Sequence, residues 1–259
     1  MRKTLLLEQS SGPRVTVITV VFNSKDTLEE TICNVIHQVG VNLEYIVIDG
    51  GSKDGSIDII RKYENSISYW VSEPDDGIYD AMNKGVAHAN GDWVIFMNSG
   101  DGFFCEQTLA RVVAQISGAP DIVYGDVQVI KNGFPVRVIA SKKIKVPLRC
   151  MPACHQSMMI KTKRLQQYPY DKRISIAADF DNLCRILASG GTVQQIPIVV
   201  SQISAGGLSD VKRDEVYKQY QRISNLYFGA SISGSLFYFI RRAWEKIKLH
   251  IKKILGMAH

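Results

Sequence analysis

The sequence predicts an α/β fold in which a mainly parallel sheet is flanked by helices, followed by a helical and basic C-terminal extension. Three observations carry this prediction. Short β-branched apolar runs alternate with segments of helical periodicity. This alternation favours right-handed βαβ units, in which the strands are parallel. The chain also has 259 residues, of which 46% are hydrophobic, enough to bury a sizeable core.

The first half of the chain alternates strands and helices in a regular order. Residues 15–22 form a β-branched run that ends at Asn23 and Ser24, which predicts a buried strand. Asp26 or Thr27 can cap the next helix, because their side-chain oxygens accept hydrogen bonds from free backbone amides. The first expected helix ends near residue 39, and the next two cover residues 56–63 and 80–89. The other expected strands cover residues 45–48, 67–71 and 93–97.

The second half is less regular, and it ends in a helical tail. An Asn132-Gly133 pair predicts a hairpin turn. We expect a catalytic domain over residues 1–209 and an amphipathic, basic helical extension over residues 210–259. The elements expected in between are helices at 107–116 and 176–189 and strands at 122–124, 127–130 and 193–200.

The net charge of +6 is concentrated near the C-terminus, where residues 241–253 contain six Lys or Arg and the single acid Glu245. The rest of the chain is close to neutral, which argues against a nucleic-acid-binding protein. The sequence contains no run of about 18 apolar residues, so we expect no membrane-spanning helix. The N-terminal segment does not resemble a signal peptide. An odd number of five cysteines favours a reducing, cytoplasmic compartment. A zinc site at Cys150, Cys154 and His155 is disfavoured because no second ligand pair follows.

Acidic and polar residues follow two of the predicted strands. Asp49 ends the second strand and precedes a loop of Gly and Ser, whose backbone amides can bind an anion. Asn98 and Asp101 follow the fourth strand, and Asp101 can bind a hard divalent cation. The carboxyl ends of parallel strands face the crevice in which open α/β sheets bind ligands. Each of these loops, taken alone, is also typical of an ordinary turn.

A third acidic segment, Asp75, Asp76 and Asp80, precedes or opens a predicted helix. Negative side chains are favourable there because of the helix dipole, and capping accounts for Asp80. Capping accounts less well for two adjacent acids beside Gly77. The order of the three segments therefore predicts a metal and phosphate site at one edge of the sheet.

Four segments together resemble the family 2 glycosyltransferases of the GT-A (Rossmann-like) fold: VTVITVVFNS, EYIVIDGGSKDGS, SEPDDGIYDAMNKGVAHANGDWVIFMNSGD and IAADFDNLCRI. The segments IDGGSKDGS, EPDDGIYDAMNKG and FMNSGD more narrowly resemble the branch for colanic-acid and O-antigen biosynthesis. The resemblance implies that Asp49 contacts a nucleobase, that Asp101 binds a metal at the donor diphosphate, and that Asp179 is the general base. The donor-binding residues expected from these motifs are Asn23, Asp49, Gly50, Ser52, Asp76, Asp80, Asn83, Asn98, Ser99 and His155.

The chain departs from the wider family at the metal motif. An Asp-x-Asp pattern is common there, whereas this chain has Asn98, Gly100 and a single acid, Asp101. Asn98 can coordinate a hard cation through its carbonyl oxygen but adds no charge. We therefore expect Mn²⁺ or Mg²⁺ to be bound with much of the ligation supplied by the diphosphate. His155-Gln156 and residues 204–209 also resemble family segments, although a structural histidine and a plain connecting loop remain open alternatives.

The C-terminal tail has an apolar stripe at intervals of three and four residues: Ile240, Trp244, Ile247, Ile251 and Ile254. Lys and Arg cover much of the remaining circumference. This pattern favours an amphipathic helix on an anionic membrane surface, here the cytoplasmic face of the inner membrane. The alternative is a helix packed on the catalytic domain with a solvated basic face.

The expected activity is the inverting, non-processive transfer of one sugar from a nucleotide-diphosphate sugar to a saccharide acceptor, lipid-linked, in cell-surface polysaccharide biosynthesis. A single addition is favoured because the Gln-x-x-Arg-Trp signature of processive enzymes is missing. Two alternatives remain open. One is a sugar-phosphate nucleotidyltransferase, but residues 23–26 are a poor match to the phosphate-binding loop that such an enzyme needs. The other is a non-catalytic scaffold that binds sugar nucleotides, and the weakened acidic motif favours this alternative.

Overall fold

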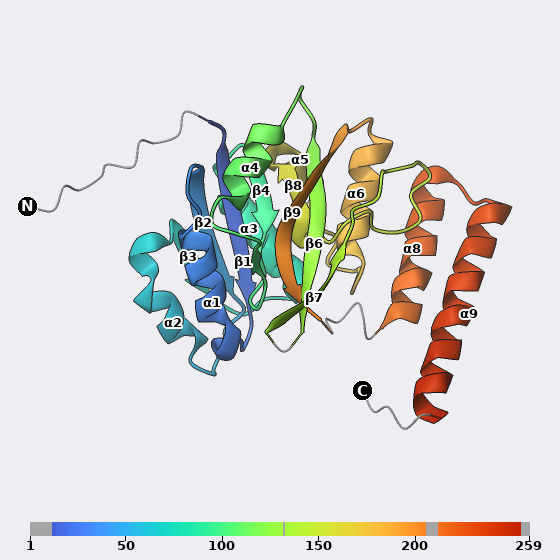
Figure 1. Cartoon of the computed structure of the whole chain (residues 1–259), viewed down its shortest axis with the longest axis horizontal. Helices are drawn as coiled ribbons and strands as arrows, with labels where there is room; N and C mark the ends of the chain where they lie inside the picture. The colour runs from blue at the N-terminus through green and yellow to red at the C-terminus, as the bar shows by residue number, and fades with distance from the viewer. Residues whose placement is uncertain (1–11, 132, 206–211, 255–259) are drawn as a thin grey trace, which may run out of the picture.

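A computed structural model describes residues 12–131, 133–205 and 212–254 of the chain. Its centre is a nine-stranded sheet, drawn in Figure 1. The four N-terminal strands are parallel and lie in the order β3-β2-β1-β4, as the alternating sequence pattern predicts. Their bounds are β1 (Arg14–Val21), β2 (Asn42–Asp49), β3 (Tyr69–Ser72) and β4 (Trp93–Phe96).

The second half of the sheet mixes parallel and antiparallel pairs. The strand β8 runs antiparallel to both β4 and β6, β9 runs parallel to β6, and β5 runs antiparallel to β9. The α/β class is therefore confirmed, but the sheet is mixed rather than mainly parallel. The bounds are β5 (Gly102–Phe103), β6 (Ile122–Lys131), β7 (Phe134–Ile139), β8 (Met158–Lys161) and β9 (Val193–Ser204).

This change of direction brings additional chain segments to the carboxyl edge of the parallel strands. Because β8 is antiparallel to β4, the residues just before β8 lie where β4 ends. They form a short 3₁₀ helix, η2 (His155–Ser157). The strands β6 and β9 also end at this edge, and β5 begins there. This edge therefore gathers the carboxyl ends of β1, β2, β3, β4, β6 and β9 and the beginnings of β5 and β8.

Helices cover both faces of the sheet because the side chains of each strand alternate between them. Val17 and Ile95 belong to the core on one face, and Ile18 and Phe96 belong to the core on the other. The first face carries α1 (Lys25–Ile36), α2 (Ser56–Lys62) and α4 (Thr108–Gln115), and a 3₁₀ turn, η1 (Glu64–Ser66), follows α2. The second face carries α3 (Ile78–His88), α5 (Thr162–Gln167) and α6 (Ala178–Ala188).

In the second half, one strand differs from the sequence-based expectation and one hairpin agrees with it. The strands predicted at 122–124 and 127–130 are one continuous strand, β6, with an irregularity between Tyr124 and Val127. Gly125 allows this close approach, because a Cβ there would lie 2.6 Å from the carbonyl oxygen of Ile198. The predicted hairpin is confirmed by the antiparallel β6–β7 pair, although position 132 itself lies outside the described residues.

The C-terminal helices α8 (Arg213–Phe228) and α9 (Ile232–Ile254) lie side by side at the end of the molecule, with α9 outermost (Figure 1). The helix α8 packs on α6, where the ring centroids of Tyr220 and Phe180 are 4.1 Å apart. Tyr238 of α9 is buried and donates to the backbone oxygen of Tyr220. The predicted boundary at 209/210 lies outside the described residues, and no described helix is long and apolar enough to cross a membrane.

Candidate active site

Asp49 ends β2 and holds the loop that follows it. Its side chain is completely buried. Its Oδ2 accepts hydrogen bonds from the amides of Gly51 (3.1 Å) and Ser52 (2.9 Å) and from Ser72 Oγ (2.6 Å), while its Oδ1 accepts from Ser52 Oγ. The contact of Asp49 with the donor stays a prediction. In this conformation both carboxylate oxygens bind groups of the protein, so Asp49 would affect donor binding by fixing the shape of the loop.

The same loop is fixed to the end of β1 by Asn23. The Asn23 amide donates to Ser52 Oγ at 2.8 Å, and Asn23 Oδ1 accepts from the Lys53 amide at 2.9 Å. Asn23 has a left-handed backbone with φ of 47°, a conformation that Asn tolerates better than most residues. Asn23, Asp49 and Ser52 therefore form one hydrogen-bonded unit at the carboxyl ends of two neighbouring strands.

Gly50 leaves an open position in this loop, and two side chains from other segments flank it. A Cβ at Gly50 would lie 2.3 Å from Asp75 Oδ2 and 3.3 Å from Cδ2 of Phe22. Asp75 Oδ1 accepts from the Gly77 amide at 2.9 Å, and the Phe22 side chain is 64% exposed. The carboxylate of Asp75 and the exposed ring of Phe22 therefore both lie next to the backbone of Gly50. Asp75 belongs to the acidic segment that the sequence predicts at this edge, but neither Asp75 nor Phe22 was among the expected donor-binding residues.

The loop after β4 is held by a polar stripe of α1. Thr31 accepts from the Gly100 amide at 3.0 Å and donates to the Asp101 backbone oxygen at 2.9 Å. The side-chain amide of Asn34 donates to the backbone oxygen of Phe103 and accepts from its backbone amide. Thr27 Oγ1 lies 3.1 Å from Ser99 Oγ. These three residues lie on one face of the helix, at a spacing that can be recognised in the sequence.

Asp101 is held on two sides within this loop. Its Oδ2 accepts from Gln156 Nε2 at 2.7 Å, and its Oδ1 faces the Ser204 amide at 3.4 Å. Removal from water raises the pKa of Asp101 to about 6. The hydrogen bonds from Gln156 and Ser204 oppose this shift. The carboxylate of Asp101 is partly buried and has no cation partner among the described residues, so binding of a positive charge beside it would be favourable.

A second chain of contacts links Asn98 to Asp179 through His155. Asn98 Nδ2 lies 3.1 Å from His155 Nε2, and His155 Nδ1 lies 3.8 Å from Asp179 Oδ2. In this amide orientation Asn98 donates to Nε2, so the ring proton is on Nδ1 and faces Asp179. Burial lowers the pKa of His155 to about 4, so the ring is neutral at neutral pH.

Asp179 lies in the first turn of α6, and its Oδ1 accepts from the Phe180 amide at 2.8 Å. Burial raises the pKa of Asp179 to about 6. A carboxylate with such a pKa is ionised at neutral pH yet is a stronger base than an exposed Asp, which suits proton abstraction. Asp181 differs, because it pairs with Arg185 at 2.9 Å and accepts from the Tyr227 hydroxyl.

Three predicted donor residues on α3 and its preceding loop make contacts within the protein. Asp76 and Asp80 both pair with Lys172, each at 2.9 Å. The side-chain amide of Asn83 donates to the backbone oxygen of Tyr170 and accepts from its backbone amide, each at 2.8 Å. These contacts attach α3 to the segment before α6, and the predicted donor role of all three stays a prediction.

The fit of a divalent metal rests on Asp101 and Asn98. No three His, Cys, Asp or Glu side chains of the described chain are grouped so that they could hold a metal ion. Asn98 Oδ1, however, is buried and has no hydrogen-bond partner among the described residues. One carboxylate and one free amide oxygen at a strand end fit Mg²⁺ or Mn²⁺, ions that are bound by few protein ligands together with substrate phosphates.

Comparison with known proteins places the chain in a family. The profile of glycosyl transferase family 2 matches residues 16–179, and the chain therefore belongs to this family of glycosyltransferases. An uncharacterized glycosyltransferase of Mycobacterium tuberculosis is 29% identical, over 94% of this chain and 100% of that protein. A PGL/p-HBAD biosynthesis glycosyltransferase of Mycobacterium bovis is 27% identical, over 92% of this chain and 93% of the other.

Solved structures confirm the predicted GT-A fold. S. aureus TarS 1–349 in complex with UDP-GlcNAc superposes with a TM-score of 0.66 and 17% identity, over 83% of this chain and 66% of TarS. The mannosyltransferase PcManGT of Pyrobaculum calidifontis, in complex with GDP-Man and Mn²⁺, superposes with a TM-score of 0.65 and 20% identity, over 91% of this chain and 71% of that enzyme. At these identities the likeness shows the fold.

Proposed function

We propose that this glycosyltransferase moves one sugar from a nucleotide-diphosphate sugar to a saccharide acceptor that is lipid-linked, with inversion at the anomeric carbon. The observation that carries the proposal is the row Asn98–His155–Asp179, which joins the loop of Asp101 to a partly buried carboxylate with a raised pKa. The complexes of TarS with UDP-GlcNAc and of PcManGT with GDP-Man support a donor of this class. The narrower assignment to colanic-acid and O-antigen biosynthesis stays a prediction.

In the proposed reaction Asp179 takes the proton of the attacking acceptor hydroxyl. The hydroxyl oxygen forms a bond to the anomeric carbon as the bond from that carbon to the donor diphosphate breaks, and the nucleoside diphosphate leaves. His155, neutral and hydrogen-bonded to Asn98, separates the base from the donor loop without adding charge. Asp101 and Asn98 would hold Mg²⁺ or Mn²⁺, which offsets negative charge on the diphosphate when bound.

For the nucleobase we infer a role for Asp75. Asp49 has no exposed oxygen, whereas Asp75 presents its Oδ2 beside Gly50, next to the exposed Phe22 ring. A carboxylate accepts a hydrogen bond from a ring N–H of uracil or guanine, and an aromatic face stacks on either base. This combination supports a nucleotide site at the ends of β1 and β2.

A product assay tests the proposed reaction. With UDP- and GDP-sugars, Mn²⁺ and a lipid extract as acceptor, we expect release of nucleoside diphosphate that depends on the acceptor. Release of pyrophosphate from a sugar phosphate and a nucleoside triphosphate would instead identify a nucleotidyltransferase. Binding of sugar nucleotide without turnover in any acceptor extract would identify a scaffold protein.

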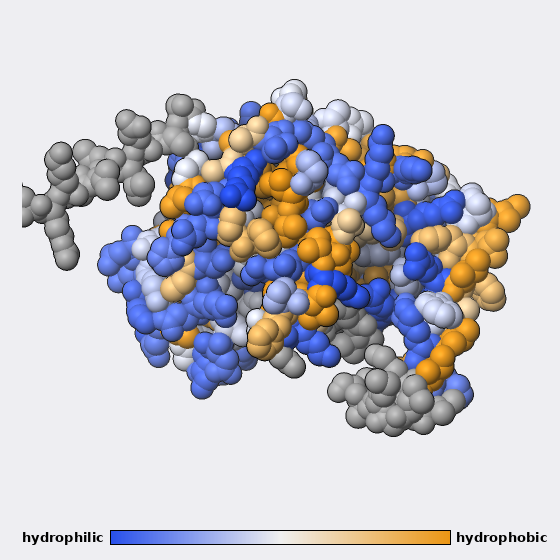
Figure 2. Space-filling model, in the orientation of Figure 1, coloured by the Kyte–Doolittle hydropathy of each residue, from blue (hydrophilic) through white to orange (hydrophobic). Residues whose placement is uncertain are grey.

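The apolar stripe of α9 supports a peripheral position on an anionic membrane. Ile240, Trp244, Ile247 and Ile251 are each about half exposed, between 47% and 56%, so this face is not packed on the catalytic domain. Figure 2 shows orange, hydrophobic surface along the outermost helix. Arg241, Lys246 and Lys248 add basic side chains to the same helix. Apolar burial and attraction to acidic lipids then act together.

Point variants on the exposed face test this position without disturbing the fold, because Tyr238 ties the beginning of α9 to the domain. The triple variant Trp244→Ser, Ile247→Ser, Ile251→Ser is expected to bind phosphatidylglycerol-containing vesicles at least about tenfold more weakly, since each substitution removes apolar surface from the lipid contact. Sedimentation with vesicles measures this. Leu226→Ser on α8, also exposed, is the matched control. Unchanged sedimentation of the triple variant would contradict the membrane role.

A further inference from the structure

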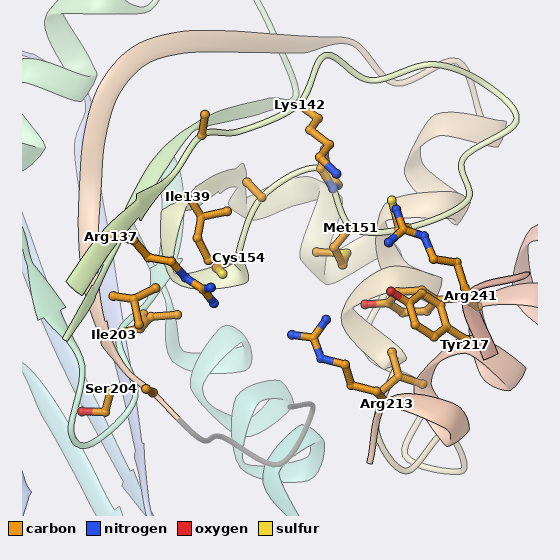
Figure 3. A pocket seen from close by; sticks show the side chains of 18 of the residues that line it. Arg137, Ile139, Lys142, Met151, Cys154, Ile203, Ser204, Arg213, Tyr217 and Arg241 are labelled. Carbon is orange, nitrogen blue, oxygen red and sulfur yellow. The ribbon is translucent and has the colours of Figure 1, made fainter. Parts of the chain in front are cut away.

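A cavity of about 360 Å³ lies between the β6–β7 hairpin, the segment that leads to η2, the end of β9 and the helices α8 and α9 (Figure 3). Arg137 of β7 and Arg213 of α8 point into it from opposite sides. Lys142 and Arg241 contribute two further cationic side chains. The cavity is thus built from five separate parts of the chain.

The lining carries an excess of positive charge. The described residues that line it include these four Lys and Arg residues and no Asp or Glu. In the described part of the chain, Arg137 and Lys142 have no ion pair, and Arg241 contacts the ring of Phe237 at 5.4 Å. Cations that converge on one cavity produce a positive potential that attracts an anion. Arginine in particular suits phosphate, because its planar donors match phosphate oxygens.

The remaining lining is mostly apolar. Val129, Ile139, Met151, Ile203 and Phe237 all contribute to the wall. A free inorganic anion needs no such surface. The combination of cationic and apolar side chains instead fits an amphiphile that carries a phosphate group beside a hydrocarbon or sugar portion.

The cavity lies between the proposed base and the proposed membrane face. Tyr220 lines it and packs against Phe180, the residue that follows Asp179. Cys154 lines it and directly precedes His155. On the other side, Phe237 and Arg241 belong to α9. A molecule that enters from the lipid surface along α9 therefore reaches the neighbourhood of Asp179 through this cavity.

We propose that this cavity binds the phosphate or diphosphate group of the acceptor, and that the acceptor is a saccharide linked to a lipid through phosphate. The inference rests on the proposed function and adds the chemistry of the linkage. The donor diphosphate is assigned to a different place, the loop of Asn98 and Asp101. Arg137, Lys142, Arg213 and Arg241 then hold the acceptor head group while its sugar hydroxyl faces Asp179.

The experiment measures binding of geranyl diphosphate to the full chain by calorimetry, with geraniol and inorganic pyrophosphate as partial probes. Geranyl diphosphate is expected to bind at least about tenfold more tightly than either partial probe. Arg137→Gln and Lys142→Gln are each expected to weaken its binding about tenfold, because each removes a charge-assisted contact to phosphate. Both residues are exposed, so folding should be unaffected. Lys143→Gln, an exposed neighbour outside the cavity, is the matched control and should bind like the wild type.

UDP and GDP binding, measured on the same proteins, separates this inference from the proposed function. We expect Arg137→Gln and Lys142→Gln to bind both nucleotides as the wild type does, and Asp75→Asn to lose nucleotide affinity while it keeps geranyl diphosphate. If Arg137→Gln and Lys142→Gln weaken nucleotide binding instead, the cavity holds the donor diphosphate and the inference is wrong. Equal binding of geraniol, or unchanged geranyl diphosphate binding by both variants, overturns it as well. Failure of the wild type to bind any nucleotide would count against the proposed function alone.

Discussion

Replacing Asp179 with Asn is expected to lower the rate of sugar transfer by about 10²–10⁴-fold, the usual contribution of a positioned general base. Asn has the shape of Asp and can still accept the Phe180 amide, but it cannot take a proton from the acceptor. Donor binding should stay within a few-fold, because Asp179 contacts His155 and not the loop of Asp101. Transfer rates and nucleotide affinity, measured on the same preparation, check both statements.

The stability of Asp179→Asn provides a control for folding. Because the pKa of Asp179 is raised to about 6, the ionised carboxylate opposes folding above that pH. The Asn variant should therefore gain up to about 2–3 kcal/mol in the free energy of unfolding at pH 8, a gain that vanishes below the ordinary pKa of Asp. Asp181→Asn is the matched contrast, since it loses the ion pair with Arg185 and should be less stable but active. Activity of Asp179→Asn within a few-fold of the wild type would reject the assignment.

The same raised pKa predicts the pH dependence of transfer. The base acts as a carboxylate, so kcat/KM should fall as the pH drops through about 6, the value to which burial raises both Asp179 and Asp101. His155 stays neutral over this range and should contribute no step. A profile that is flat down to the pKa of an exposed Asp would contradict the burial of both groups.

Sequence alone could predict the first half of the fold and one edge of the site. The apolar runs before Asn23, Asp49 and Asn98 alternate with helical segments and end in polar residues, and parallel strands necessarily end at one edge. The strands β5 and β8 were not predicted, because β5 has only two residues and β8 pairs antiparallel with β4, outside the alternation of strands and helices. The position of η2 depends on the antiparallel direction of β8, which follows it. The pattern of the sequence therefore could not predict that His155 lies at this edge.

The residues that sequence reasoning missed depend on contacts between distant segments. Asp75 approaches Gly50 only because two loops converge, and the lack of a side chain at position 50 is visible only in three dimensions. The cavity cations likewise come from β7, the segment after it and two helices, and nothing in the local sequence distinguishes Lys142 from its neighbours Lys143 and Lys145. The polar stripe of α1, by contrast, is a pattern of Thr27, Thr31 and Asn34 that the sequence does display.

Asp101→Asn is expected to reduce metal-dependent transfer by about 10²–10³-fold, because Asp101 is the one acid that the strand end offers to a cation. Asn98 is neutral, so the protein alone should bind Mn²⁺ weakly and the nucleoside diphosphate should be needed for tight binding. In Asp101→Asn the donor affinity should then no longer rise with Mn²⁺, while affinity measured without metal changes little. Calorimetric titration of UDP and GDP with and without Mn²⁺ measures this coupling.

A variant of the neighbouring loop residue separates loss of a metal ligand from loss of loop structure. The hydroxyl of Ser99, in the same loop as Asp101, contacts Thr27 of α1, so Ser99→Ala perturbs the loop without removing charge and should retain the Mn²⁺ response. Asp101→Asn should also be more stable at pH 8, because it removes a carboxylate whose pKa is raised by burial. Lower stability together with an intact Mn²⁺ response would mean that Asp101 serves the loop through Gln156 and Ser204, and that the cation is held by the donor diphosphate without this carboxylate.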